Sequence, residues 1–135
     1  MAQEINAITK YGPRVKQFST VTMDRLVTYI AGRSGLNEGT ISNVLIELRE
    51  ALLFFSLSGE AVKLDGLGTF SPKIGLDGTI RVAHLPDKWL KNRLNDSNQF
   101  KGGLINKENI GKKMEDLVDL WNQEHPDDLI KKKKK

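Results

Sequence analysis

The stretch EAVKLDGLGTF, residues 60–70, decides the fold. Its first part alternates apolar and polar side chains, which is typical of a half-buried strand, and residues 65–68 supply the Asp and Gly that turns require. Residues 69–74 predict a second strand, and the GLDG sequence at 75–78 predicts a tight hairpin turn into a third strand at 79–85. The pattern therefore indicates a three-stranded antiparallel meander.

Helical periodicity lies on both sides of this meander. Apolar residues recur every three or four positions over 23–33, after the candidate N-cap Thr22, and over about twenty residues that follow the candidate cap Asn37. After the meander, Pro86 suits the first turn of a short helix that ends near Asn95. The order predicts an α+β domain over residues 21–95.

The two ends of the chain carry weaker signals. Residues 1–20 contain two short alternating stretches around the breaker Tyr11-Gly12-Pro13, so we expect a β-hairpin or an ordered arm there. Residues 96–130 predict a polar linker and then a fourth helix over 107–124, with Asn106 as its candidate cap. Residues 131–135 are five lysines, for which we expect a solvated, self-repelling tail.

The net charge of +4 and the pI near 9.3 suggest an anionic partner, but most of that charge lies in the tail. Residues 1–130 carry 16 basic and 17 acidic residues and are almost neutral. The basic pI is therefore weak evidence for a nucleic-acid partner.

Several function classes lack support in the sequence. There is no cysteine, and His84 and His125 have no second ligand at metal-binding spacing, so we expect no metal site. The hydrolase, zinc-protease and phosphate-loop motifs are missing, so we expect no enzyme, no cofactor and no small-molecule substrate. The longest apolar run, residues 51–55, is too short to cross a bilayer, and no basic-then-apolar leader opens the chain. We therefore expect neither a membrane partner nor secretion.

Two helices, a meander and a short helix, together with the motif Gly66-Leu67-Gly68-Thr69-Phe70, resemble the HU/IHF family of bacterial histone-like proteins. Leu67 stands where the family usually has an aromatic residue. The segment VAHLPDKWLK, residues 82–91, is most similar to divergent HU-like proteins of Bacteroides-type bacteria and their phages. The two glycines either serve close strand approach beside an inward Phe70 or merely make a turn.

The resemblance implies a dimer that binds double-stranded DNA with a basic saddle and two long arms. Only nine residues separate Phe70 from Ile80, which is too short for an arm, so we expect weak bending or none. Strand alternation places three cations on the outer sheet face, and two lysines of the short helix could extend this basic surface. Ordinary solvated side chains without a binding role explain these cations about as well. The candidate DNA contacts are Lys63, Lys73, Arg81, Lys88 and Lys91. The lysine tail could add non-specific phosphate contacts.

The helix after Asn37 is apolar nearly all round at residues 51–55, which predicts cover by a second subunit or another protein. The candidate interface residues are Leu48, Leu52, Phe54, Phe55 and Trp121, although Trp121 could equally pack within its own domain. Two hypotheses remain: an HU/IHF-like, sequence-independent DNA-binding protein of the bacterial cytoplasm and nucleoid, and the same fold used as a structural or assembly subunit, for example in a phage virion.

Overall fold

The computed structural model describes residues 1–97 and 99–131. The chain forms two compact units. Unit 1 combines the two ends of the chain, residues 1–18 and 101–135, and unit 2 consists of the continuous segment between them, Ser19–Phe100.

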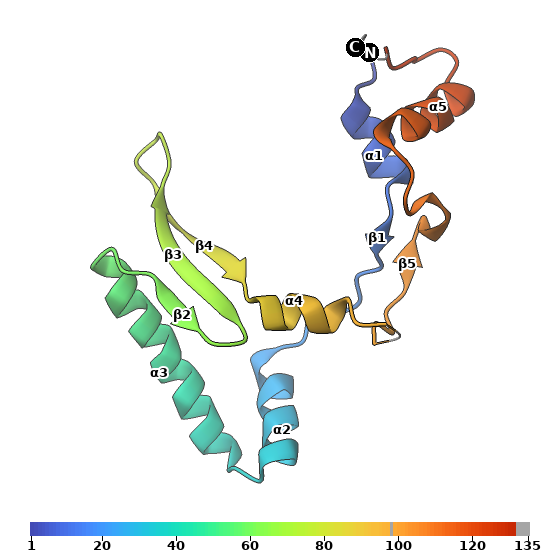
Figure 1. Cartoon of the computed structure of the whole chain (residues 1–135). Helices are drawn as coiled ribbons and strands as arrows, with labels where there is room; N and C mark the ends of the chain where they lie inside the picture. Colours follow the sequence, from blue (N-terminus) through green and yellow to red (C-terminus); the bar gives the residue numbers. More distant parts are fainter. Residues whose placement is uncertain (98, 132–135) are drawn as a thin grey trace. The chain divides into compact units, whose positions relative to one another are not determined.

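Unit 2 begins with two helices, α2 (Met23–Ser34) and α3 (Glu38–Leu57), close to the helices that the sequence predicts (Figure 1). Gly35 ends α2 in the left-handed conformation with φ of 73°. The Asn37 side chain caps α3 by accepting hydrogen bonds from the backbone N–H groups of Gly39 and Thr40, at 2.8 and 3.4 Å. Thr22 stands at the N-cap of α2 but makes no side-chain capping bond.

The predicted meander is confirmed as an antiparallel sheet in the order β2-β3-β4. Its strands are β2 (Val62–Leu64), β3 (Gly68–Ile74) and β4 (Ile80–Pro86). A tight turn over residues 75–79 joins β3 to β4, where the Gly75 N–H donates to the Thr79 carbonyl at 2.9 Å. The long arm is therefore absent, as the sequence predicts.

The short helix α4 (Lys88–Leu94) starts two residues later than Pro86 suggests. Pro86 ends β4 instead, and the Asp87 side chain caps α4 by accepting a hydrogen bond from the Trp89 N–H at 2.8 Å. The Asp87 N–H donates to the Leu67 carbonyl at 3.1 Å. This bond fixes the start of α4 to the glycine motif.

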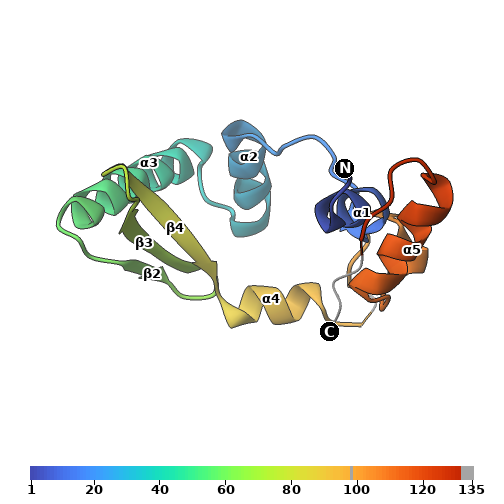
Figure 2. The same cartoon turned by 90° about the horizontal axis from the view of Figure 1, so that it is seen from above.

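Helix α3 runs along one face of the sheet, beside β2 and β3 (Figures 1 and 2). On β2, Val62 and Leu64 are half-buried and Lys63 is exposed, so the covered face is the one that carries Val62 and Leu64. The register places Phe70, Val82 and Ile80 on that same face, as predicted. However, Ile80 and Val82 are 71% and 58% exposed, because α3 leaves β4 uncovered within one chain.

In unit 1, residues 1–20 do not form the β-hairpin that was one of the two predicted alternatives. Residues Glu4–Tyr11 form a helix, α1, and the short strand β1 (Arg14–Val15) pairs with β5 (Leu104–Ile105) and not with a neighbouring strand of a hairpin (Figure 1). Gly12 and Pro13 break the chain between α1 and β1 without reversing it into a hairpin. The partner strand lies about 90 residues away, where no local pattern could indicate it.

The predicted fourth helix is shorter than residues 107–124. A 3₁₀ turn, η1 (Lys107–Asn109), follows Asn106, and helix α5 covers only Met114–Glu124. Gly111, with φ of 86°, separates the two because a left-handed residue cannot continue a right-handed helix. Asn106 does not cap the helix through its side chain.

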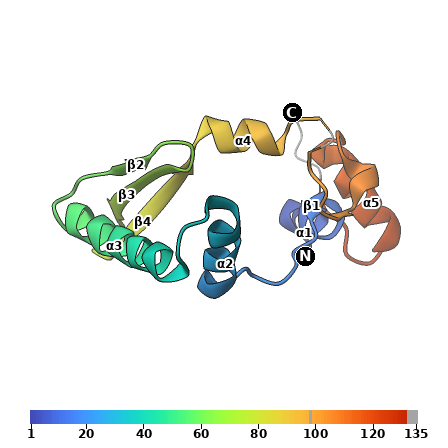
Figure 3. The same cartoon turned by 90° about the horizontal axis from the view of Figure 1, so that it is seen from below.

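Helix α1 packs against α5 in unit 1 (Figure 3). Their contact contains the largest buried cluster in the described part of the chain: Ala2, Ala7, Tyr11, Leu117, Val118 and Ile130, with Leu120 and Trp121 at its edge. The two ends of the chain therefore share one core. The lysine tail lies outside the described residues apart from Lys131, so the expectation of a solvated tail stays a prediction.

Candidate nucleic-acid interface

The sheet face opposite α3 carries the predicted cations Lys63, Lys73 and Arg81, here called the basic sheet face. All three side chains belong to exposed residues. The register pairs Lys73 directly with Arg81 across β3 and β4, and it pairs Lys63 with Thr69 across β2 and β3. The structure therefore places the three cations on one face. The Lys73–Arg81 pair lies near the β3–β4 turn, and Lys63 lies toward the other end of the sheet.

Two like charges opposite each other destabilise an antiparallel pair, and no acid on that face compensates them. The acid nearest to the pair along the chain is Asp77 in the turn. Its carboxylate accepts hydrogen bonds from the Thr79 N–H and hydroxyl, both at 3.0 Å, and these bonds lower the pKa of Asp77. The Asp77 carboxylate is therefore hydrogen-bonded within its own turn, and the positive charge of Lys73 and Arg81 is available to an anion.

Lys88 and Lys91, the other two predicted contacts, are exposed and lie about one turn apart on α4. They come from a different element than the sheet cations. On the same helix, the Arg93 guanidinium lies 5.6 Å from the centre of the Trp89 ring, and Trp89 is 56% exposed. The short helix thus adds three cations to unit 2.

The glycine motif is a structural element at the foot of the sheet. Gly66 has φ of 79° and Gly68 has φ of 146°, conformations that L side chains rarely adopt. A Cβ on Gly68 would lie 2.3 Å from the Leu85 carbonyl oxygen, so only glycine permits β3 and β4 to approach here. The Phe70 ring stacks on the His84 ring across the strands at 4.6 Å. Close approach, and not only a turn, is therefore what Gly68 provides.

The predicted interface residues of α3 differ in exposure. Leu48 and Leu52 are half-buried, whereas Phe54 and Phe55 are 66% and 42% exposed and contact each other edge-to-face at 5.2 Å. Among the described residues of unit 2, the buried hydrophobic side chains are Val27 and Ile41. Unit 2 therefore leaves apolar surface on α3 and β4 that a single chain does not cover.

Trp121 lies in unit 1, where its indole N–H donates to the Asp128 carbonyl at 2.8 Å and its ring stacks on the His125 ring at a centroid distance of 3.9 Å. Its place at the edge of the α1–α5 core serves packing within its own unit. A role of Trp121 at an interface with another chain stays a prediction.

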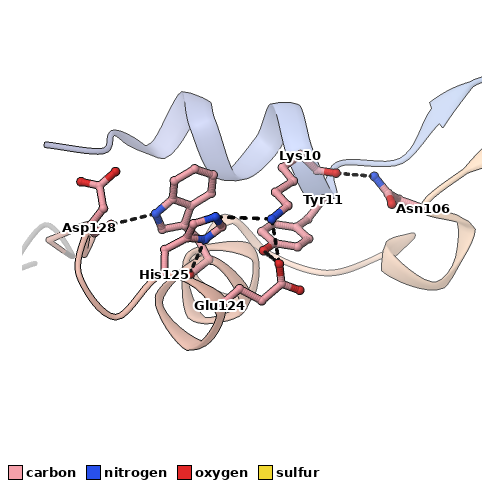
Figure 4. Close-up of polar contacts among 7 residues, drawn as sticks. Lys10, Tyr11, Asn106, Glu124, His125 and Asp128 are labelled. Carbon is pink, nitrogen blue, oxygen red and sulfur yellow. Dashed lines mark hydrogen bonds and ion pairs between the residues drawn. The ribbon is translucent and has the colours of Figure 1, made fainter.

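Beside Trp121 lies a polar cluster that the sequence did not indicate (Figure 4). The Glu124 carboxylate accepts hydrogen bonds from Lys10 Nζ at 2.7 Å and from the Tyr11 hydroxyl at 2.6 Å. The bond from Lys10 lowers the pKa of Glu124 and raises that of Lys10, while burial raises the pKa of the Tyr11 phenol. Lys10 and Glu124 stand 114 residues apart, so only the fold brings these residues together.

Two asparagines bind the same, C-terminal end of α1. The Asn106 amide donates to the carbonyls of Lys10 and Gly12, at 2.8 and 3.0 Å, and the buried Asn109 donates to the Tyr11 carbonyl at 2.7 Å. Asn106 has φ of 55°, a left-handed conformation that asparagine tolerates better than most residues. These bonds satisfy the last carbonyls of α1 and serve structure.

Over residues 1–97 and 99–131, no three His, Cys, Asp or Glu side chains gather as a metal site would require. In the same residues, no helix is long and apolar enough to span a membrane.

A comparison with known protein families agrees with the fold. Residues 2–93 match a family described as HU domain fused to wHTH, Ig, or Glycine-rich motif. Because the match covers more than half of the chain, this protein belongs to that family of HU-domain proteins. The HU/IHF-like resemblance is thereby confirmed, and the kinship with Bacteroides and phage proteins stays a prediction.

One similar solved structure is a point mutant of HU from Thermotoga maritima. It shares 19% sequence identity with this chain at a TM-score of 0.48, and the alignment covers 55% of this chain and 99% of that one. The search of curated proteins found no match.

Proposed function

We propose that this protein is a non-enzymatic, histone-like protein that binds double-stranded DNA without reading its sequence. The basic sheet face contacts phosphates, and Lys88 and Lys91 of α4 extend that contact. The observation that carries the proposal is the direct opposition of Lys73 and Arg81, both exposed and with no acid on their face of the sheet. Such a pair costs stability in the free protein, and a bound phosphate backbone would offset that cost.

The bending of DNA is expected to be weak. The β3–β4 connection is a tight turn over residues 75–79, so no arm extends from the sheet to reach around a duplex. Phosphate contacts from a short sheet position a protein on DNA and carry no direct sequence information. A local, sequence-independent contact is the mode that this geometry favours.

We further propose that unit 2 acts as a homodimer. Its buried hydrophobic side chains are few, and Phe54, Leu57, Ile80 and Val82 are all more than half exposed. Apolar surface on this scale marks a contact with another protein. A second copy would cover α3 and the uncovered face of β4, while the basic sheet face lies on the other side of the sheet.

A structural or assembly subunit, such as a virion component, is the second candidate. The near-neutral charge of residues 1–130 and the missing arm favour it, since both reduce what the chain can offer to DNA. In that case the exposed apolar surface of α3 would contact other protein subunits, and the sheet cations would be solvated.

The deciding experiment measures duplex DNA binding across a salt series from about 50 to 200 mM. We would compare the native chain with the triple variant Lys63→Gln, Lys73→Gln, Arg81→Gln. A matched control, Arg25→Gln, Arg49→Gln, Lys112→Gln, removes the same charge from three exposed positions elsewhere. If the sheet binds DNA, the salt slope falls by about 0.9 for each lost contact in the first variant only.

The lysine tail needs its own variant, in which residues 131–135 are replaced by glutamine. If only this variant weakens binding, the tail explains the affinity and the sheet proposal fails. If no form binds DNA while the protein forms a stable higher assembly, the structural candidate replaces the first. Circular dichroism of every variant verifies that its helices and sheet remain.

A further inference from the structure

Unit 1 carries a second concentration of positive charge, on the two-stranded ribbon formed by β1 and β5. Arg14 pairs with Ile105, and one step further the Lys16 N–H donates to the Gly103 carbonyl at 2.8 Å. Because alternate residues of a strand point the same way, Arg14 and Lys16 lie on one face of the ribbon. Lys101 lies two residues before Gly103, within about 7 Å of it along the chain.

The Lys16 side chain packs over Gly103, which has no side chain of its own. A Cβ on Gly103 would lie 3.4 Å from Lys16 Cβ and 3.5 Å from Lys16 Cδ, which is ordinary van der Waals contact. The aliphatic part of Lys16 therefore passes over Gly103 onto the neighbouring strand. The Lys16 stem thus lies against the segment that Lys101 precedes by two residues.

No acidic residue compensates this charge locally. Residues 5–18 and 99–107 contain five basic residues and not one Asp or Glu. The ion pairs among the described residues are Lys10–Glu124 and Arg49–Glu50, so Arg14, Lys16 and Lys101 have no ion-pair partner there. All three are exposed.

Arg14 is also held in place without losing its charge. One of its guanidinium nitrogens, Nη1, donates to the Thr9 carbonyl at 2.7 Å, and a carbonyl is a neutral acceptor. The guanidinium has five N–H donors, so most of its hydrogen-bonding capacity stays free. Its planar fork suits a phosphate with two oxygens to offer.

We propose that Arg14, Lys16 and Lys101, here called the ribbon cluster, form a second phosphate-contact site for double-stranded DNA. A repeating polyanion matches several closely spaced, uncompensated cations, and a two-stranded ribbon fits the width of the major groove. Lys101 lies outside the residues that the family match covers. The choice of DNA as the ligand rests on the proposed function, but the ribbon cluster belongs to unit 1 and the basic sheet face to unit 2.

The test uses the full chain with Arg14→Gln, Lys16→Gln and Lys101→Gln, because glutamine removes the charge and keeps part of each stem. Duplex DNA binding is measured over the same salt series, beside the Arg25, Arg49 and Lys112 control triple. We expect the salt slope to fall by about 2 to 3 relative to the native chain, which corresponds to about 0.9 for each contact. The control triple should leave the slope nearly unchanged.

The outcomes separate this inference from the proposed function. If the sheet variant lowers the slope and the ribbon variant behaves like the control, the ribbon site is overturned and the proposed function stands. If the ribbon variant lowers the slope and the sheet variant does not, the ribbon site holds and the sheet assignment fails. A native chain that does not bind duplex DNA overturns both.

Loss of folding could imitate loss of binding, so a second variant is needed. Lys101→Gln alone removes one ribbon cation that makes no side-chain hydrogen bond to the described residues. It should lower the salt slope by about 0.9 while the intrinsic fluorescence of the two tryptophans, Trp89 and Trp121, stays native. An unchanged slope in this folded single variant contradicts the inclusion of Lys101 in the site.

Discussion

Replacing Gly68 by alanine should destabilise unit 2 far more than the same change at Gly66, although both glycines have positive φ. At Gly68, with φ of 146°, the new Cβ would lie 2.3 Å from the Leu85 carbonyl oxygen and 2.6 Å from His84 Nε2. At Gly66, with φ of 79°, the nearest atom is Trp89 Cε3 at 3.9 Å. Gly66→Ala therefore meets only backbone strain, whereas Gly68→Ala also meets the backbone of β4.

The two free energies of unfolding can be compared from these distances. An alanine in the left-handed region costs about 1 to 2 kcal/mol, which is the whole expected effect of Gly66→Ala. Gly68→Ala carries strain of about 1 to 3 kcal/mol and must also move β4 away from β3, at about 1 kcal/mol for each ladder hydrogen bond it weakens. We expect a loss of about 4 kcal/mol, a large part of the roughly 5 to 15 kcal/mol that stabilises a domain.

Urea denaturation followed by circular dichroism measures both variants, at one protein concentration because assembly would shift the midpoint. The double variant Gly68→Ala, His84→Ala removes the flexible imidazole but keeps the Leu85 carbonyl, so it should recover little stability. Equal midpoints for Gly66→Ala and Gly68→Ala would refute the reasoning. Full recovery in the double variant would show that the imidazole, and not the strand backbone, is the obstacle.

Three further predictions follow from individual contacts. Arg81→Glu places an acid opposite Lys73 and should stabilise the hairpin by about 0.5 kcal/mol in thermal melts, yet weaken DNA binding; a loss of stability would contradict the cross-strand repulsion. Glu124→Gln should destabilise unit 1 at neutral pH, because Lys10 lowers the carboxyl pKa in the folded state. The difference in unfolding free energy between this variant and the native chain should shrink as pH falls through and below the usual carboxyl range. If thermal melts gave the same difference at every pH, the ion pair would be excluded as its source. Asn109→Leu leaves a buried carbonyl of α1 without its donor and should cost about 1 to 3 kcal/mol by urea denaturation, whereas a neutral effect would mean that water replaces the amide.

The sequence predicted unit 2 well because its signals are local. The helix that follows the Asn37 cap and the alternation around Lys63 are each decided by residues within one element or one turn. The exposure of Ile80 and Val82 was not predictable in this way, since the pattern indicates which face is apolar and not whether one chain can cover it. The candidate cations of the sheet share a face for the same local reason.

Unit 1 was predicted poorly because its structure depends on pairs of residues far apart in the chain. Helix α1 has only eight residues and is stabilised by α5, more than 100 residues later, so its own short pattern resembled a hairpin. The ribbon cations could not be grouped from the sequence, because Lys16 meets Gly103, two residues after Lys101, only when β1 pairs with β5. The periodicity that suggested a helix from residue 107 continued through Gly111, whose left-handed conformation ends it.

The shared core of α1 and α5 also sets an order of events during synthesis. Ala7 and Tyr11 leave the ribosome roughly 100 residues before the α5 side chains that bury them. At a synthesis rate of about 5 to 20 residues per second, the apolar face of α1 stays without α5 for about 5 to 20 seconds. All of Ser19–Phe100 is synthesised within that interval. The segment that begins the chain is therefore among the last to reach its final packing, and a nascent chain halted before α5 would hold a complete HU-like unit with an unpaired apolar segment at its start.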